Sequence, residues 1–371
     1  MASELAPPAR RLVMCCDGTW NKPDKLSDGV KVPTNVVKVA LGVRPVGADG
    51  AEQLLYYQRG VGTRRFQHVR GGAFGYGLSR NVRACYEFLV DNYEPGDELY
   101  FFGFSRGAYT ARSTVGFIRN CGILRRDQRG RIDEAYALYR SRASESHPRT
   151  IESQIFRRMY SHDDIEIRFI GVWDTVGALG IPIDGLRIPF MDKYWGFHDT
   201  NLSRSVRSAY HALAIDEQRG PFKPTLWTQL GDAEEQVLEQ VWFAGVHSDV
   251  GGGYAEPALA EIPLLWMINR ASGCGLQFDP NHFAVSADAP LTEARYLGEE
   301  LAPDALGSIH ESRNKWYVLL PRHRRTLADH NCQSAASSAV QRLAERRDYS
   351  PPSLKAWVEA KRRHTNVWDG S

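Results

Sequence analysis

A serine between two glycines is the feature of this sequence most directly suited to chemistry. The segment GFSRG (Gly103–Gly107) follows the apolar run Leu99–Phe104 and precedes a helical pattern over Arg106–Asn120. In a strand–turn–helix context, GxSxG predicts a sharp turn that exposes the serine hydroxyl at the end of the strand. We therefore expect Ser105 to be a nucleophile, and the alternative is a structural serine that caps the following helix.

A nucleophilic serine needs a base to remove its proton and an acid to orient that base. Two later apolar runs, Ile165–Trp173 and Gln240–Val246, read as strands, and Asp174 and His247 follow them directly. Because parallel strands end at the same edge of a sheet, both side chains should lie near the serine. We predict a catalytic triad of Ser105, Asp174 and His247, which would attack a carbonyl carbon and form an acyl-enzyme.

Other residues could fill the same roles. Asp249 lies two residues after the predicted base and is the alternative acid. His211 is a weaker alternative base, because it lies in the segment Leu202–Glu217, which we interpret as a helix. Just beyond it, we expect Asp216 and Arg219 to form a structural ion pair.

The oxyanion that develops on the substrate needs two hydrogen-bond donors fixed in advance. The backbone N–H of Arg106, directly after the nucleophile, is the first expected donor. If Arg11–Cys16 is the first strand, Gly18 and Thr19 occupy the loop that usually supplies the second. Asp17 is expected to hydrogen-bond within this loop, and a metal-ligand role is the weaker alternative because no metal-binding motif surrounds it. We expect neither a metal nor an organic cofactor.

Strands and helices alternate along the chain, which indicates parallel βαβ units. We therefore predict an α/β fold of the α/β-hydrolase type, with a doubly wound, mostly parallel sheet, helices on both faces and a cap insertion. The chain reads as one domain over residues 1–371, with a catalytic core at 10–280, a cap segment at 181–199 and a C-terminal extension at 285–371 that packs on the core. Expected helices also include Asn35–Val43, Leu78–Asn92 and Ile262–Arg270.

The segment 181–199 is unusually rich in large apolar residues for a loop. It follows the strand end that bears Asp174, so it should lie over the predicted catalytic edge. Phe190, Trp195 and Phe197 are candidates to line an acyl pocket. The alternative is that the same residues are simply buried in a packed cap.

Composition is that of an ordinary globular protein, with 43% hydrophobic and 24% charged residues. The net charge of +2 argues against a nucleic-acid partner. Short basic runs such as Arg322–Arg325 are interpreted as solvated faces, and the alternative is that they contact a membrane surface transiently. The six cysteines form no CxxC pair, which favours a cytoplasmic location. The N-terminus lacks the apolar core of a signal peptide and no run could span a bilayer, so export would not use a cleaved signal.

The chain also resembles a known family at these residues. The catalytic domains related to class-one phospholipase effectors of type VI secretion, also known as domain-of-unknown-function family 2235, share five ordered blocks with it, and together the blocks span roughly residues 10–267. They are CCDGTWN (Cys15–Asn21), GFSRGAYTAR (Gly103–Arg112), GVWDTVGALG (Gly171–Gly180), HALAIDEQRGPF (His211–Phe222) and GVHSDVGGGY (Gly245–Tyr254). This resemblance implies a serine esterase that acts on phospholipid ester bonds.

Two other functions remain open at this point. The chain could hydrolyse small soluble esters, since the sequence shows no membrane-docking module. It could also be a binding protein that keeps the fold without the chemistry, because a fold does not fix a function.

Overall fold

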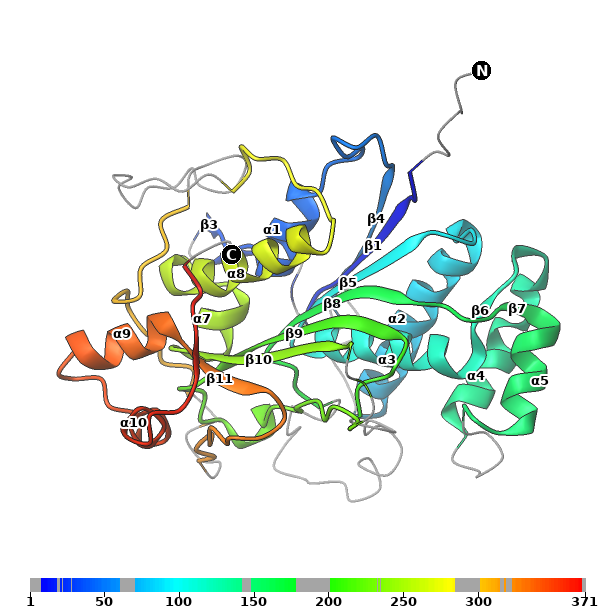
Figure 1. Cartoon of the computed structure of the whole chain (residues 1–371). Coiled ribbons are helices and arrows are strands. Elements are labelled where there is room, and N and C mark those ends of the chain that lie inside the picture. Colours follow the sequence, from blue (N-terminus) through cyan, green and yellow to red (C-terminus); the bar gives the residue numbers. More distant parts are fainter. Residues whose placement is uncertain are drawn as a thin grey trace.

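The computed structural model describes residues 8–18, 21, 23–27, 29–60, 71–141, 148–177, 201–231, 233, 235–283, 301–313, 317 and 322–368, with the backbone alone for 71–76 (Figure 1). Its main feature is an eight-stranded sheet in the order β12-β11-β10-β9-β8-β5-β1-β4, in which every pairing is parallel. The strands are β1 (Arg11–Cys16), β4 (Gln53–Gln58), β5 (Glu98–Phe104), β8 (Ile167–Trp173), β9 (Val206–Ala214), β10 (Val237–Phe243), β11 (Gln333–Ala336) and β12 (His364–Thr365).

Helices cover both faces of this sheet (Figure 1). One face carries α1 (Asn35–Gly42), α7 (His247–Gly251), α8 (Ala258–Gly273), α9 (Ser337–Glu345) and α10 (Pro352–Glu359). The other carries α2 (Gly71–Asn92), α3 (Arg106–Cys121), α4 (Ile132–Arg140) and α5 (Ile151–Tyr160). Two small antiparallel ladders, β2 (Leu26–Ser27) with β3 (Val30–Lys31) and β6 (Ile123–Leu124) with β7 (Ser161–His162), lie outside the main sheet. The predicted doubly wound α/β fold is confirmed.

The strand order reverses next to β1. From β1 the chain crosses to β4 on one side, and from β5 onward it proceeds to the other side. In doubly wound sheets, ligands bind at the carboxyl ends of the strands that flank such a switch point. Here those strands are β1 and β5, and their register pairs Cys16 with Gly103, so the loops that begin at Asp17 and Ser105 start side by side.

The prediction of a helix over Leu202–Glu217 is wrong. Residues Val206–Ala214 form β9, a central strand between β8 and β10. The run VRSAYHALA contains few strongly β-forming residues, but all except Arg207 are buried between the two helical layers. A strand buried on both faces loses the alternation of polar and apolar residues that identifies a strand in the sequence, so tertiary packing decides its conformation.

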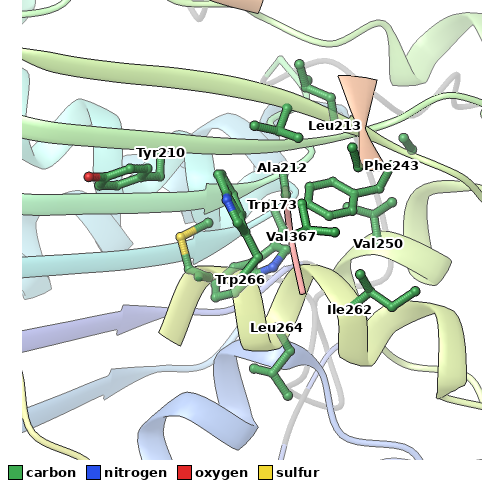
Figure 2. Packing of buried hydrophobic residues seen from close by; sticks show 14 of the residues in the cluster. Trp173, Tyr210, Ala212, Leu213, Phe243, Val250, Ile262, Leu264, Trp266 and Val367 are labelled. Atoms are coloured by element: carbon green, nitrogen blue, oxygen red, sulfur yellow. The ribbon is translucent and has the colours of Figure 1, made fainter. Parts of the chain in front are cut away.

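Each face of the sheet has its own apolar core. On the face of α8, the large rings of Trp173, Tyr210 and Phe243 project from neighbouring strands toward Trp266 of the helix (Figure 2). Tyr210 and Trp266 meet edge to face, with ring centroids 5.9 Å apart. On the other face, α3 packs on β1, β5 and β8, and α2 packs on α3 and β4. Such interdigitated packing holds the strand ends rigidly, and these strand ends carry the predicted site.

The C-terminal part of the chain contributes strands to the same sheet. β11 pairs with β10 and β12 pairs with β11, both in parallel. Helix α9 follows β11 and packs on it, and Trp357 of α10 is buried. Residues 333–365 therefore extend the sheet at its β10 edge. The predicted cap segment at 181–199 lies outside the described residues.

Candidate active site

Ser105 lies in a tight turn between β5 and α3. Its backbone adopts φ 58° and ψ −120°, a left-handed conformation that is unfavourable for residues other than glycine. The flanking glycines permit this turn, since a Cβ atom on Gly107 would collide with the carbonyl oxygen of Cys16, and one on Gly103 would lie 2.6 Å from the Cα of Ala108. Strain of this kind persists where the surrounding structure fixes it, as it does at this strand end.

A chain of hydrogen bonds joins the three residues predicted to act together. Nε2 of His247 lies 2.8 Å from Oγ of Ser105, and Nδ1 of His247 lies 2.5 Å from Oδ2 of Asp174. All three residues are buried. The rings of Phe104 and Phe222 pack against the imidazole at centroid distances of 4.6 and 4.9 Å. The imidazole is therefore fixed within reach of the serine proton.

His247 is the first residue of the short helix α7, and does not end a strand as predicted. β10 ends at Phe243, and the Asp249 carboxylate accepts a hydrogen bond from the Val246 N–H at 2.9 Å, which caps α7. Burial lowers the pKa of His247 below its ordinary value, and its hydrogen bond to Asp174 offsets only part of this effect. The imidazole is consequently neutral near pH 7, the form that can accept a proton.

Asp174 directly follows β8 and is held by a residue that the sequence did not single out. The Arg325 guanidinium donates to both carboxylate oxygens of Asp174, with Nη2 2.9 Å from Oδ2. It also donates to the carbonyl oxygens of Ala214 and Phe222, at 2.9 and 2.6 Å. Burial alone would raise the pKa of Asp174, but the charge of Arg325 and the hydrogen bond to His247 hold it well below the ordinary value. The carboxylate stays ionised.

Arg325 belongs to a basic run that we interpreted as solvated. For Arg325 that interpretation is wrong, because the residue is buried. Its charge is tolerated inside the protein only because its donors meet a carboxylate and two carbonyl oxygens. No local pattern could have identified it, since its partner lies 151 residues earlier in the chain.

The alternative acid, Asp249, is engaged elsewhere. Its Oδ1 lies 2.6 Å from Nδ1 of His310, and the Tyr254 ring stacks on that imidazole at a centroid distance of 4.0 Å. The hydrogen bond to Asp249 raises the pKa of His310. Asp249 therefore anchors the segment at His310 to α7 and forms no hydrogen bond with the imidazole of His247.

The alternative base, His211, lies inside the sheet. In β9 its Nε2 accepts a hydrogen bond from the backbone N–H of Thr175 at 3.1 Å, and burial lowers its pKa to about 3.

The prediction of an ion pair between Asp216 and Arg219 is wrong. Arg219 pairs with Glu217, with donor–acceptor distances of 2.9 and 2.8 Å. Asp216 instead accepts from the N–H of Gly245 and the hydroxyl of Tyr349.

The loop after β1 lies against Ser105. A Cβ on Gly18 would lie 3.1 Å from the Cβ of Ser105, which shows how closely the backbone approaches the serine. The Gly18 N–H, however, donates to Asp17 at 2.7 Å, so this amide is already engaged. Thr19, the other predicted donor in the loop, lies outside the described residues. The N–H of Arg106 lies in the first turn of α3, where backbone donors lack partners within the helix.

Asp17 is buried beneath the same loop. Within the loop, as predicted, it accepts a hydrogen bond from the Gly18 N–H, and it also accepts from the more distant Thr34 and Tyr57 hydroxyls, at 3.0 and 2.7 Å. Burial raises its pKa to about 6 although these hydrogen bonds oppose the change. No group of three or more potential metal-ligating side chains occurs among the described residues.

The chain is similar to a known protein family and to two uncharacterized proteins. The model of the phospholipase effector Tle1-like catalytic domain of type VI secretion matches residues 10–270. An uncharacterized protein of Saccharomyces cerevisiae is 28% identical over 249 residues, which is 62% of this chain and 34% of that protein. A crystal structure of an uncharacterized protein from Pseudomonas aeruginosa matches with a TM-score of 0.42 and 17% identity, over 79% of this chain and 49% of that one.

The chain thus spans about a third of the curated relative and about half of the solved structure. No helix in the described part of the chain has the length and apolar character to cross a membrane. The family model, by contrast, covers well over half of the chain and includes both β1 and helix α7, which begins at His247. The chain belongs to the family of Tle1-like catalytic domains of type VI secretion phospholipase effectors.

Proposed function

We propose that this protein is a serine hydrolase that cleaves carboxylic ester bonds of phospholipids through an acyl-enzyme on Ser105. The observation that supports this most is the buried chain of hydrogen bonds from Ser105 through His247 to Asp174. A neutral imidazole at hydrogen-bond distance from a hydroxyl is the arrangement that general-base catalysis requires. Membership of a phospholipase effector family points to a lipid ester as the substrate.

In the first half of the reaction, Nε2 of His247 accepts the Ser105 proton while Oγ attacks the ester carbonyl carbon. Asp174 holds the ring and stabilises its positive charge. The tetrahedral oxyanion receives the Arg106 N–H and a second donor from the loop at Gly18 and Thr19, which we assign to Thr19 because the Gly18 N–H donates to Asp17. The imidazolium then protonates the leaving alcohol, a lysophospholipid, and the C–O bond breaks. Water, deprotonated by the same imidazole, cleaves the acyl-enzyme and releases a fatty acid.

A fluorophosphonate probe tests the nucleophile. It reacts with an activated serine and not with one that is merely exposed, so wild-type protein should be labelled and Ser105→Ala should not. The matched control is Ser153→Ala, which removes a buried hydroxyl that lies 3.2 Å from the Asn120 side chain, on helix α5. Equal labelling of wild type and Ser105→Ala would refute the proposal, and absence of labelling in both would favour a binding protein on this fold.

The substrate class is tested with phospholipid vesicles. Release of free fatty acid and lysophospholipid by the wild type, and its loss in Ser105→Ala, is expected for a phospholipase of the A type. Turnover of short soluble esters without any release of fatty acid from phospholipid would identify the alternative, an esterase for small substrates. Separating the two lysophospholipid isomers would then assign the position that is cleaved.

The apolar segment 181–199 is proposed to line the acyl pocket. Replacing Trp195 and Phe197 by Ala should then depress hydrolysis of a long-chain phospholipid much more than that of a short ester, because only the long chain needs an apolar wall. Phe190 is the third proposed lining residue. Equal losses on both substrates, together with a lowered melting temperature, would instead assign these residues to the packed core.

A further inference from the structure

Arg106 is a buried cation without a partner in the described part of the chain. The residue directly follows Ser105 and is only 8% exposed. Its guanidinium forms neither an ion pair nor a hydrogen bond with any described residue, and its Nε atom is buried without an acceptor. Buried polar groups in proteins nearly always have partners, so an orphan next to a nucleophile requires an explanation.

Other buried arginines of the chain show what is missing. Arg325 meets a carboxylate, and Arg342 donates to the carbonyl oxygens of Ala305 and Gly307 at 2.8 and 2.7 Å. Arg112, six residues further along α3, donates to two carbonyl oxygens and stacks over the Trp227 ring.

Arg106 has none of these compensations. Burial lowers its pKa to about 10, and no described carboxylate or carbonyl oxygen accepts a hydrogen bond from its side chain. Its position at the N-terminus of α3 adds to the cost, since that end of a helix favours anions.

The charges around the hydrogen-bond chain leave Arg106 unbalanced. Asp174 is paired with Arg325, and Glu217 is paired with Arg219, so each pair sums to zero. The imidazole between them is neutral at pH 7. Arg106 then contributes one positive charge that none of these carboxylates neutralises. Asp17 forms no ion pair with Arg106 either, and its oxygens accept hydrogen bonds from Gly18, Thr34 and Tyr57.

Arg106 lies near residues that pack around the imidazole of His247. Arg219 and Tyr317 both affect the pKa of Arg106, so they lie within electrostatic range of it. The Arg219 guanidinium stacks 3.5 Å above the Phe222 ring, which packs against both Tyr317 and His247. The unpaired guanidinium therefore shares its surroundings with the residues that cover the catalytic imidazole.

We propose that the Arg106 side chain binds a singly charged phosphate oxyanion beside Ser105, and that this anion is the phosphodiester of the phospholipid being cleaved. The proposal rests on the proposed function and names the group that the site selects. A planar guanidinium can donate two parallel hydrogen bonds to two phosphate oxygens, which suits it to this task better than a lysine. The N-terminus of α3 reinforces the attraction, and the single negative charge of a phosphodiester cancels the single unbalanced positive charge.

The test compares two substrates that differ only in the phosphodiester. Short-chain phosphatidylcholine and the diacylglycerol with the same acyl chains are assayed with wild type, Arg106→Met and Arg106→Lys. Loss of a charge-assisted hydrogen bond should lower kcat/KM for phosphatidylcholine about 10- to 100-fold more than for diacylglycerol in Arg106→Met. Arg106→Lys should recover part of this selectivity, because it keeps the charge without the planar geometry.

The melting temperature distinguishes a binding role from a structural one. Replacing an arginine that only stabilises the fold would lower the melting temperature. Removing an unpaired buried charge should leave the melting temperature of Arg106→Met unchanged or raise it. The control Arg112→Met, from the same helix, should lower the melting temperature, because it leaves the carbonyl oxygens of Thr225 and Leu226 without their donor. A lowered melting temperature of Arg106→Met with equal losses on both substrates would overturn the proposal while leaving the serine mechanism intact.

Inhibition by inorganic phosphate tests whether Arg106 binds the phosphodiester of a lipid or a free phosphate ion. Phosphate should inhibit diacylglycerol hydrolysis competitively in wild type and at least about tenfold less strongly in Arg106→Met. Weaker phosphate inhibition with unchanged selectivity between the two lipids would assign the site to free phosphate and overturn the phosphodiester proposal. Failure of the serine mechanism is recognised independently, because Ser105→Ala would then still hydrolyse diacylglycerol.

Discussion

The Arg325–Asp174 pair gives the sharpest test of how the site is held together. Arg325→Met keeps most of the side-chain volume but removes a guanidinium that meets the Asp174 carboxylate and two carbonyl oxygens. Both members of the pair are fully buried. Breaking such a pair from one side costs about 3 to 5 kcal/mol, because the remaining charge is left buried without compensation.

The expected change in melting temperature follows from chain length. An unfolding entropy of about 2.1 cal/mol/K per residue amounts to about 0.8 kcal/mol/K for 371 residues, so the melting temperature should fall by about 4 to 6 °C at pH 7. Turnover should fall about 10- to 100-fold at permissive temperature, because a carboxylate that shifts no longer orients the imidazole. Calorimetry and ester hydrolysis measure the two effects.

The pH dependence identifies the carboxylate as the origin of the loss. Asp174 has a depressed pKa in the folded protein, so the stability it contributes is present above its unfolded pKa of about 3.9 and is lost as pH falls through the folded value. Without Arg325 that pKa rises, so the variant loses less on acidification. The difference in free energy of unfolding between wild type and Arg325→Met should therefore shrink below about pH 4.

Arg342→Met is the matched control for this experiment. It also removes a buried arginine with two carbonyl acceptors, but it leaves the Asp174 pair untouched. It should lower the melting temperature without lowering turnover at permissive temperature. An Arg325→Met variant with wild-type turnover, or a stability difference that grows as the solution is acidified, would refute the reasoning.

Three further outcomes follow from the site geometry. Asp174→Asn should lower turnover by about 10⁴-fold while Asp249→Asn mainly lowers the melting temperature, and the reverse result would exchange the two roles. Because burial keeps the pKa of His247 below 6.5, activity should decline only as pH falls below that value, and a midpoint above pH 7 in the profile of kcat/KM would contradict a buried neutral base. Ser105→Gly should abolish hydrolysis but be more stable than Ser105→Ala by roughly 1 kcal/mol, because glycine adopts φ 58° without strain. Calorimetry of the two variants should therefore show the higher melting temperature for Ser105→Gly.

Local patterns in the sequence were sufficient for the turn that carries Ser105. An apolar run, two glycines around a serine and a helical pattern occupy consecutive residues, and each constrains only its neighbours in the chain. The order of the strands and the residues at their ends similarly predicted that Asp174 and His247 would meet Ser105, because parallel strands end at one edge. These inferences need only the alternation of strands and helices and the order of residues, and both can be read from the sequence.

Tertiary packing decided the features that depend on distant segments. β9 is a strand because its neighbours bury it on both faces, although its residues do not favour that conformation strongly. Arg325 is buried because a carboxylate and two carbonyl oxygens from three other segments accept its hydrogen bonds. Asp249 forms its hydrogen bond with His310, a residue 61 positions away. The sequence alone determined which residue types stand at the carboxyl edge of the sheet, whereas their charge partners were decided only in three dimensions, because ion pairing depends on distance in space.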